Sequence, residues 1–207
     1  MEIATGLLFV SIFNQFLIGE EDFVLFFTFA PHQNLVGGSV FNFLNLIYYW
    51  TIASFLIIIF VYDLKHYLIP DRIIYPAIVI ALIFNFLPHQ IFGGGFNQFP
   101  TFKNLIFSAF GAAAFFLLIV LVSRGKWMGI GDIKLAFLMG LILGFPNILV
   151  ALFLAFFLGA IIGLGLIFFG RKTFKSEIPF GPFLITGTFI GLFCGGQIIN
   201  WYLKFFV

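Results

Sequence analysis

Gly129-Ile130-Gly131-Asp132-Ile133-Lys134 is the point at which a short basic loop runs into a new apolar segment. An aspartate at such a junction can cap the helix that follows, because its carboxylate accepts hydrogen bonds from the free N–H groups of the first turn. Placing an ionisable group at membrane depth costs on the order of 3 kcal/mol, so such a group is a candidate for a functional role. Asp132 is therefore also a candidate catalytic residue. The apolar run after it, 133–145, would rise only about 20 Å as a helix, against a hydrocarbon core of about 30 Å.

The rest of the chain is that of a membrane protein. It is 62% hydrophobic and 9% charged, with a mean hydropathy of +1.17, and these values exclude a water-soluble globule. Long apolar runs predict an all-α fold, a polytopic transmembrane bundle of about six to seven helices. We expect spans at 41–62, 72–88, 102–122, 147–169 and 178–206, with 133–145 as a shorter helix.

Two domains are predicted. Residues 1–40 are a divergent N-terminal hydrophobic or interfacial segment, and residues 41–207 are the transmembrane domain. Pro70 cannot continue a helix, so residues 63–70 are expected to form a break, with Asp71 as the N-cap of the next helix. Glycines spaced by four residues predict close helix packing, at Gly187, Gly191 and Gly195 and at Gly140 and Gly144.

Charge predicts the orientation of the bundle. Eight of the ten lysines and arginines lie in or beside the loops 63–72, 124–134 and 171–177. The positive-inside rule places these loops on the cytoplasmic side of the inner membrane, so Asp63 and Asp132 emerge on that one face. A net charge of +2 with dispersed basic residues does not indicate nucleic-acid binding, and the expected surroundings are membrane lipid.

Two carboxylates at one face suggest acid–base chemistry on a water molecule. Like charges a few Å apart cannot both ionise, so Asp63 and Asp132 would share a proton, one activating water and the other donating a hydrogen bond to the attacked carbonyl. Asp63 lies at a helix end, where the dipole disfavours a negative charge, and Asp132 at a helix start. This dipole argument predicts that Asp132 has the lower pKa and that Asp63 holds the proton.

Other site types are less well supported. The three histidines, His32, His66 and His89, lie in different loops. The single cysteine, Cys194, excludes a multi-cysteine zinc site, and we expect no metal and no cofactor. A transporter with paired acids remains an alternative, although it would place them near the midplane of the bilayer. A structural scaffold that needs neither aspartate is a second alternative.

Three blocks of the sequence resemble one family. Gly129-Ile-Gly-Asp132 followed by Lys134 and Leu135 is similar to the GxGD signature of membrane aspartyl proteases, in the form found in type IV prepilin peptidases. The segment Asp63-Leu-Lys-His-Tyr-Leu-Ile-Pro70-Asp71 resembles the family's first catalytic block. Glu177-Ile-Pro179-Phe-Gly181-Pro182 resembles the PFGP element that precedes its last helix.

The resemblance implies a function for the matching positions. Asp63 and Asp132 would be the catalytic aspartates, and Gly129, Gly131, Lys134, Pro70, Asp71, Pro179, Gly181 and Pro182 would support them. The implied reaction is removal, at the cytoplasmic face, of the leader peptide from type IV prepilin or pseudopilin precursors. Asp71 would be structural.

The N-terminal third departs from the fuller members of the family. Many of them carry two Cys-x-x-Cys pairs that bind zinc, and they also methylate the new N-terminus. Residues 1–40 contain no cysteine, so we expect a leader peptidase without the zinc insert. A bifunctional leader peptidase and N-methyltransferase is the alternative.

Overall fold

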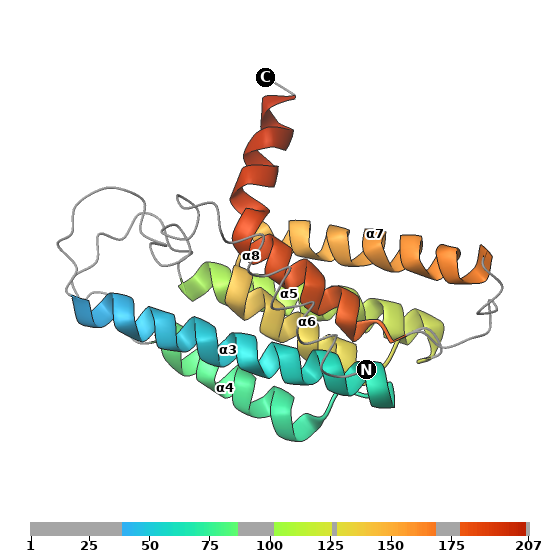
Figure 1. Cartoon of the computed structure of the whole chain (residues 1–207), viewed down its shortest axis with the longest axis horizontal. Coiled ribbons are helices and arrows are strands. Elements are labelled where there is room, and N and C mark those ends of the chain that lie inside the picture. The colour runs from blue at the N-terminus through green and yellow to red at the C-terminus, as the bar shows by residue number, and fades with distance from the viewer. Residues whose placement is uncertain (1–38, 87–101, 126–127, 169–178, 206–207) are drawn as a thin grey trace, which may run out of the picture. The chain divides into compact units, whose positions relative to one another are not determined.

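The structure is a computed structural model that describes residues 39–86, 102–125, 128–168 and 179–205. Within these ranges the chain forms six α-helices and no β-strand (Figure 1). The helices are α3 (Ser39–His66), α4 (Asp71–Phe86), α5 (Phe102–Ser123), α6 (Ile130–Leu143), α7 (Asn147–Phe168) and α8 (Gly181–Lys204). The predicted all-α membrane bundle is confirmed, while the expected N-terminal segment 1–40 falls almost wholly outside the described residues.

The chain divides into two compact units, which are Met1–Leu46 with Gln90–Gly95 and Ile47–His89 with Phe96–Val207. Only the start of α3, 39–46, is described in the first unit. Everything reported below lies in the second unit.

Four described helices are long and apolar enough to cross a membrane. They contain the segments Ile47–His66, Phe102–Ser123, Asn147–Leu166 and Gly181–Lys204. The other two are shorter, since α4 has 16 residues and α6 has 14. The predicted short helix after the glycine motif is therefore confirmed, and its bounds are 130–143 rather than 133–145.

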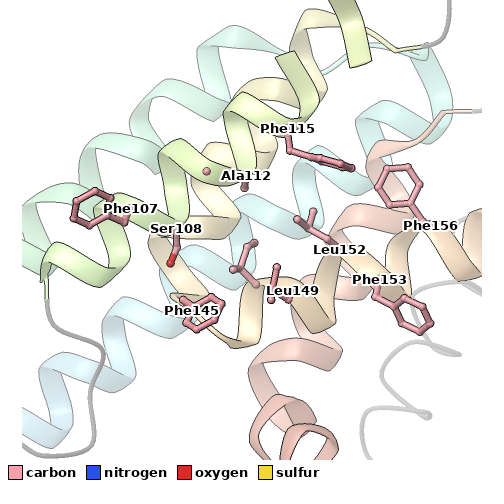
Figure 2. A pocket seen from close by; sticks show the side chains of 11 residues that line it. Phe107, Ser108, Ala112, Phe115, Phe145, Leu149, Leu152, Phe153 and Phe156 are labelled. Carbon is pink, nitrogen blue, oxygen red and sulfur yellow. The ribbon is translucent and has the colours of Figure 1, made fainter. Parts of the chain in front are cut away.

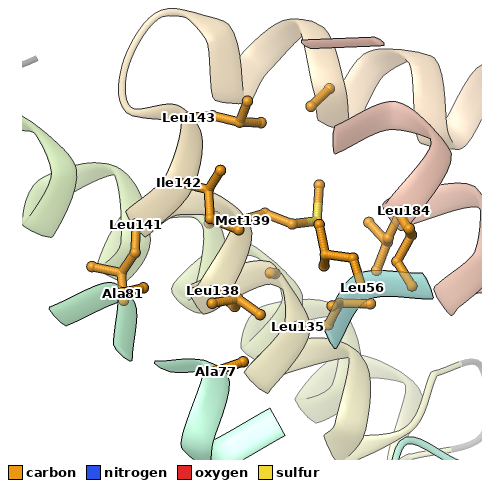
Figure 3. Close-up of a cluster of buried hydrophobic side chains, with 14 of the residues drawn as sticks. Leu56, Ala77, Ala81, Leu135, Leu138, Met139, Leu141, Ile142, Leu143 and Leu184 are labelled. Atoms are coloured by element: carbon orange, nitrogen blue, oxygen red, sulfur yellow. The ribbon is translucent and has the colours of Figure 1, made fainter. Parts of the chain in front are cut away.

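Helix α6 forms the centre of this unit. Nine of its fourteen residues are buried, and it packs against α4, α5, α7 and α8. Its side chains Leu135, Leu138 and Met139 are fully enclosed, and they lie among residues of α3, α4 and α8 such as Leu56, Ala77 and Leu184 (Figure 3). A helix that is apolar on all sides is buried on all sides, so α6 holds Asp132 inside the bundle rather than on its surface.

Helices α7 and α8 pack closely through glycines, as predicted. A Cβ atom on Gly187 would collide with the carbonyl oxygen of Ala151, and one on Gly191 would lie 3.0 Å from the Ala151 Cβ atom. A Cβ atom on Gly195 would lie 2.8 Å from Oδ1 of Asn147. These glycines therefore set the distance between the two helices.

Of the second glycine pair, Gly140 packs closely against a neighbouring helix, as predicted. A Cβ atom on Gly140 would collide with the backbone of Ala109, which brings α5 and α6 into direct contact. Gly144 is the buried C-cap of α6. It ends α6 with a φ of 65°, and its N–H donates to the Gly140 carbonyl. Glycine adopts such a positive φ without strain.

Candidate active site

Asp63 lies in the last turn of α3 and is buried, with 4% of its surface exposed. The helix does not end at Asp63, as the sequence suggested. It continues to His66, and it then ends at Tyr67, which has a φ of 55° and donates its N–H to the Asp63 carbonyl at 2.8 Å. The added turn keeps the Asp63 side chain on the regular face of α3 that packs into the bundle.

Asp132 lies in the first turn of α6 and is also buried, with 9% of its surface exposed. Gly129 is the N-cap and has an extended backbone. Its N–H donates to Oδ2 of Asp132 at 3.1 Å, and its carbonyl accepts from the Asp132 N–H at 3.2 Å. Asp132 therefore contributes to the cap from the third helical position, with its carboxylate turned back toward the start of the helix, and Gly129 rather than Asp132 is the N-cap.

Gly131 brings the break after α3 against the start of α6. A Cβ atom at this position would lie 2.9 Å from the Cβ atom of Ile69, closer than real side chains approach. Ile69 itself is buried, and it precedes Pro70 in the segment between α3 and α4. Glycine at 131 is thus required for the segment Asp63–Asp71 to pack against the segment Gly129–Lys134.

Gly181 brings the third block against Asp63. It is the first residue of α8, after Pro179 and Phe180, and Pro182 follows it in the first turn. A Cβ atom on Gly181 would collide with Oδ2 of Asp63. The start of α8 therefore faces the Asp63 carboxylate, and the positive end of its helix dipole favours a negative charge there.

Asp71 and Lys134 form an ion pair beside the site. Asp71 is not the N-cap that the sequence predicted. The carbonyl of Pro70 accepts hydrogen bonds from the N–H groups of Ile73 and Ile74, so Pro70 takes that position. Asp71 is 59% exposed, and its carboxylate raises the pKa of Lys134. The Lys134 ammonium group also lies 4.9 Å from the centre of the Tyr75 ring.

The two buried aspartates interact. Burial raises the pKa of Asp132 to about 6, the hydrogen bond from Gly129 lowers it by less, and the negative charge of Asp63 raises it further. Asp132 therefore holds a proton below about pH 6, whereas the predicted order of the two pKa values stays a prediction. The dipole argument left out the burial of Asp132, which opposes the effect of the helix start.

Burial distinguishes the pair from every other charged group in the described ranges. Asp63 and Asp132 are the charged residues that are buried there, and Oδ2 of Asp63 has no hydrogen-bond partner among the described residues. The nearby His66 is exposed, stacks on Tyr62 and is not part of the pair. Glu177, the other acid of the third block, lies outside the described residues.

Sequence reasoning missed two contacts of the site. Ile69 and Phe180 read as ordinary apolar residues, but Ile69 lies against Gly131, and Phe180 packs on Phe116 and Phe156 at centroid distances of 6.1 and 5.0 Å. The only signal for either was its place beside a motif proline or glycine. The arrangement as a whole is a buried carboxylate pair at the meeting point of three helix ends.

Comparison with known proteins gives a consistent result. Residues 50–164 match the type IV leader peptidase family. A protein of Legionella pneumophila named prepilin leader peptidase/N-methyltransferase is 33% identical over 162 residues, which are 76% of this chain and 52% of that protein. Proteins with the same name from Aeromonas hydrophila and Bacillus subtilis are each 32% identical. They cover 70% and 73% of this chain, and 48% and 57% of their own lengths.

The chain spans about half the length of the curated relatives that it matches. No solved structure matches it.

Proposed function

Because the chain belongs to the type IV leader peptidase family, we propose that it is a membrane aspartic endopeptidase that removes the leader peptide of type IV prepilin or pseudopilin precursors. The observation that carries the proposal is the buried pair Asp63 and Asp132, in which the charge of one raises the pKa of the other. The relatives named prepilin leader peptidase/N-methyltransferase support the choice of substrate. The catalytic domain is residues 41–207.

The proposed reaction is hydrolysis of a peptide bond by an activated water. Asp63, as the ionised member, takes a proton from water while the water oxygen attacks the carbonyl carbon. Asp132, as the protonated member, donates its hydrogen bond to the carbonyl oxygen, where negative charge develops. Collapse of the tetrahedral intermediate breaks the C–N bond, and the amine leaves with the proton taken from water. No covalent enzyme intermediate is needed.

The remaining motif residues would hold this pair in place. Gly129 orients Asp132 by a hydrogen bond, and Gly131 and Gly181 allow Ile69 and Asp63 to approach. Pro70 starts α4, and Pro179 and Pro182 flank the start of α8. Asp71 and Lys134 link α4 to α6 by their ion pair. None of these groups has a role in bond breaking.

We place the site on the cytoplasmic side of the inner membrane. Asp63 and Asp132 lie at helix ends that share one face of the bundle with Lys65, Arg72 and Arg124. The positive-inside rule assigns this basic face to the cytoplasm. Asp63 and Asp132 also lie in the last turn of α3 and the first turn of α6, whereas a transporter would hold its acids in mid-membrane. Labelling of a Lys65→Cys variant in a Cys194→Ala background, in intact cells and in inverted vesicles, tests this orientation. Labelling in inverted vesicles only is the expected result.

Cleavage of a purified precursor tests the function. Detergent-solubilised wild type, Asp63→Asn and Asp132→Asn are incubated with a pilin precursor, and the leader peptide is followed by mass. The wild type is expected to release it, and each variant is expected to lose at least about 1,000-fold in rate, because each removes one half of the acid–base pair. Asp71→Asn is the matched comparison, since it changes an exposed aspartate of the same block that supports the pair without acting on the substrate, and its loss of rate should be at most about tenfold. Processing by Asp63→Asn or Asp132→Asn at the wild-type rate contradicts the proposal.

A further inference from the structure

An apolar groove of about 500 Å³ lies between α5 and α7 (Figure 2). The α5 side presents Phe107, Ala112 and Phe115, and the other side presents Phe145, Leu152 and Phe156. Ser108 is the one lining residue with a side-chain hydroxyl, and that hydroxyl already donates to the Asn104 carbonyl at 2.7 Å. The groove therefore offers no free polar group and suits a wholly apolar occupant.

The α5 wall of the groove is built from small residues. Ser108, Gly111 and Ala112 follow one another at helical spacing, so they share one face of α5. A Cβ atom on Gly111 would meet nothing within 4 Å, whereas one on Gly140, behind the same helix, would collide with α5. Small residues that face open space allow another helix to approach closely, and this contact favours a helix over loose lipid chains.

The groove has the length of about two helical turns. Phe107 and Phe115 bound it on α5, and Ile148 and Phe156 are the corresponding residues on α7. Each pair is separated by eight residues, which in a helix rise about 12 Å. An occupant helix would contact the groove with roughly eight residues.

One end of the groove leads to the aspartates through aromatic contacts. Phe115 and Phe156, at that end, have ring centroids 6.0 Å apart. Phe156 packs in turn on Phe180 at 5.0 Å, and Phe180 immediately precedes Gly181, which lies against Asp63. The apolar lining thus continues to the carboxylate pair.

We propose that this groove binds the hydrophobic helix of the substrate, in its first two turns after the bond that is cut. The inference rests on the proposed function and extends it to a substrate-binding site. The N-terminal end of the bound helix lies at Phe115 and Phe156, beside the aspartates, and the helix continues from there toward Phe107 and Phe145. The extended segment of the substrate that precedes this helix then reaches Asp63 and Asp132. The distance from the start of the substrate helix therefore determines which peptide bond is cut.

Cysteine cross-linking tests this site without relying on cleavage. Cys194, the one native cysteine, is replaced by Ala, and Gly111→Cys is combined with precursors that carry single cysteines along the hydrophobic segment. We expect disulfide formation with the first two turns only. The matched control is Gly165→Cys on α7, because a Cβ atom at Gly165 also meets nothing within 4 Å and this residue is outside the groove. It should give no cross-link.

Several outcomes would overturn the groove site. They are equal cross-linking from both positions, no cross-linking from Gly111→Cys, or a Gly111→Cys homodimer that the precursor does not displace, which would assign the groove to a second copy of the chain. Failure of the wild type to cut the precursor would contradict the proposed function instead, since the cross-link reports binding alone.

A kinetic test places a large side chain at the same two positions, 111 and 165. Gly111→Trp fills the groove and is expected to lower kcat/KM for the full precursor at least tenfold, while Gly165→Trp leaves it unchanged. A short soluble peptide that spans the cleavage site but lacks the helix should be cut at the same rate by both variants and the wild type. Loss of that activity too in Gly111→Trp would indicate damage to the site and would contradict helix docking.

Discussion

Gly181 lies directly against the carboxylate of Asp63, so close that a single methyl group on Gly181 would collide with Oδ2. The last helix of the bundle therefore fixes the position of an acid that belongs to α3, far away in the sequence. The contact leaves no room for any other residue at 181. It also explains why a glycine is needed at a helix start, where many residues would serve the helix equally well.

Gly181→Ala should lower the rate of leader-peptide cleavage about 100-fold while the protein still folds. The new Cβ atom must displace Asp63 or α8, and a shift of about 1 Å in a reacting group costs on the order of 100-fold in rate. Gly196→Ala, in the same helix, is the control, because its Cβ atom would meet nothing within 4 Å. Cleavage rates of the two variants, with thermal unfolding in detergent to verify folding, check the prediction. Equal activity of the two variants would contradict it.

Activity should fall as the pH rises through about 6. The pKa of Asp132 is raised from 3.8 to about 6, so this carboxyl keeps its proton below pH 6 and loses it above. The proposed mechanism needs that proton on the carbonyl-polarising group. A pH profile of kcat/KM, which reports the free enzyme, should show this decline. A rate that instead rises through pH 6 would assign the base role to Asp132.

Asp132→Asn should make the protein more stable at neutral pH. Since the folded-state pKa is raised, the folded state binds the proton more tightly than the unfolded state, and stability declines as the pH rises from 3.8 to about 6. Above pH 6 the cost of the buried charge is about 3 kcal/mol at most, at about 1.4 kcal/mol for each pKa unit. Asparagine removes the charge and can still accept from Gly129. The free energy of unfolding of the two proteins should differ at pH 8 and converge near pH 4.

Gly140→Ala should destabilise the bundle by about 1–3 kcal/mol, because the new methyl group would collide with the backbone of Ala109 and separate α5 from α6. Gly111→Ala provides the comparison. It lies on the same helix pair but faces open space, so it should be neutral or stabilising by up to about 1 kcal/mol through helix propensity. Urea or thermal unfolding of both variants checks the difference.

Most of the helices could be predicted because apolar length and proline position determine them. The spans expected at 41–62, 102–122 and 147–169 correspond to α3, α5 and α7. The end of α3 could not be predicted, because the residue that stops it, Tyr67, takes a left-handed conformation that its side chain does not favour.

The candidate pair was predictable for a different reason. Charged residues are rare in this chain, so a buried Asp63 and Asp132 stood out from residue type and topology alone. The raised pKa of Asp132 was not predictable, because it depends on how deeply Asp132 is buried and on the nearby charge of Asp63. Both are long-range packing facts that local helix position does not reveal.

Helix α4 has a consequence for the lipid around the protein. Its 16 residues span about 24 Å, less than a hydrocarbon core of about 30 Å, and it presents Tyr75, Val79 and Ile83 outward. A bilayer meeting this face must thin locally, and the mismatch costs a fraction of a kcal/mol for each Å. We therefore expect faster cleavage in vesicles of short-chain phosphatidylcholine than in long-chain vesicles at equal fluidity. Thinning would bring the aqueous boundary toward the carboxylates and shorten the path by which the attacking water arrives.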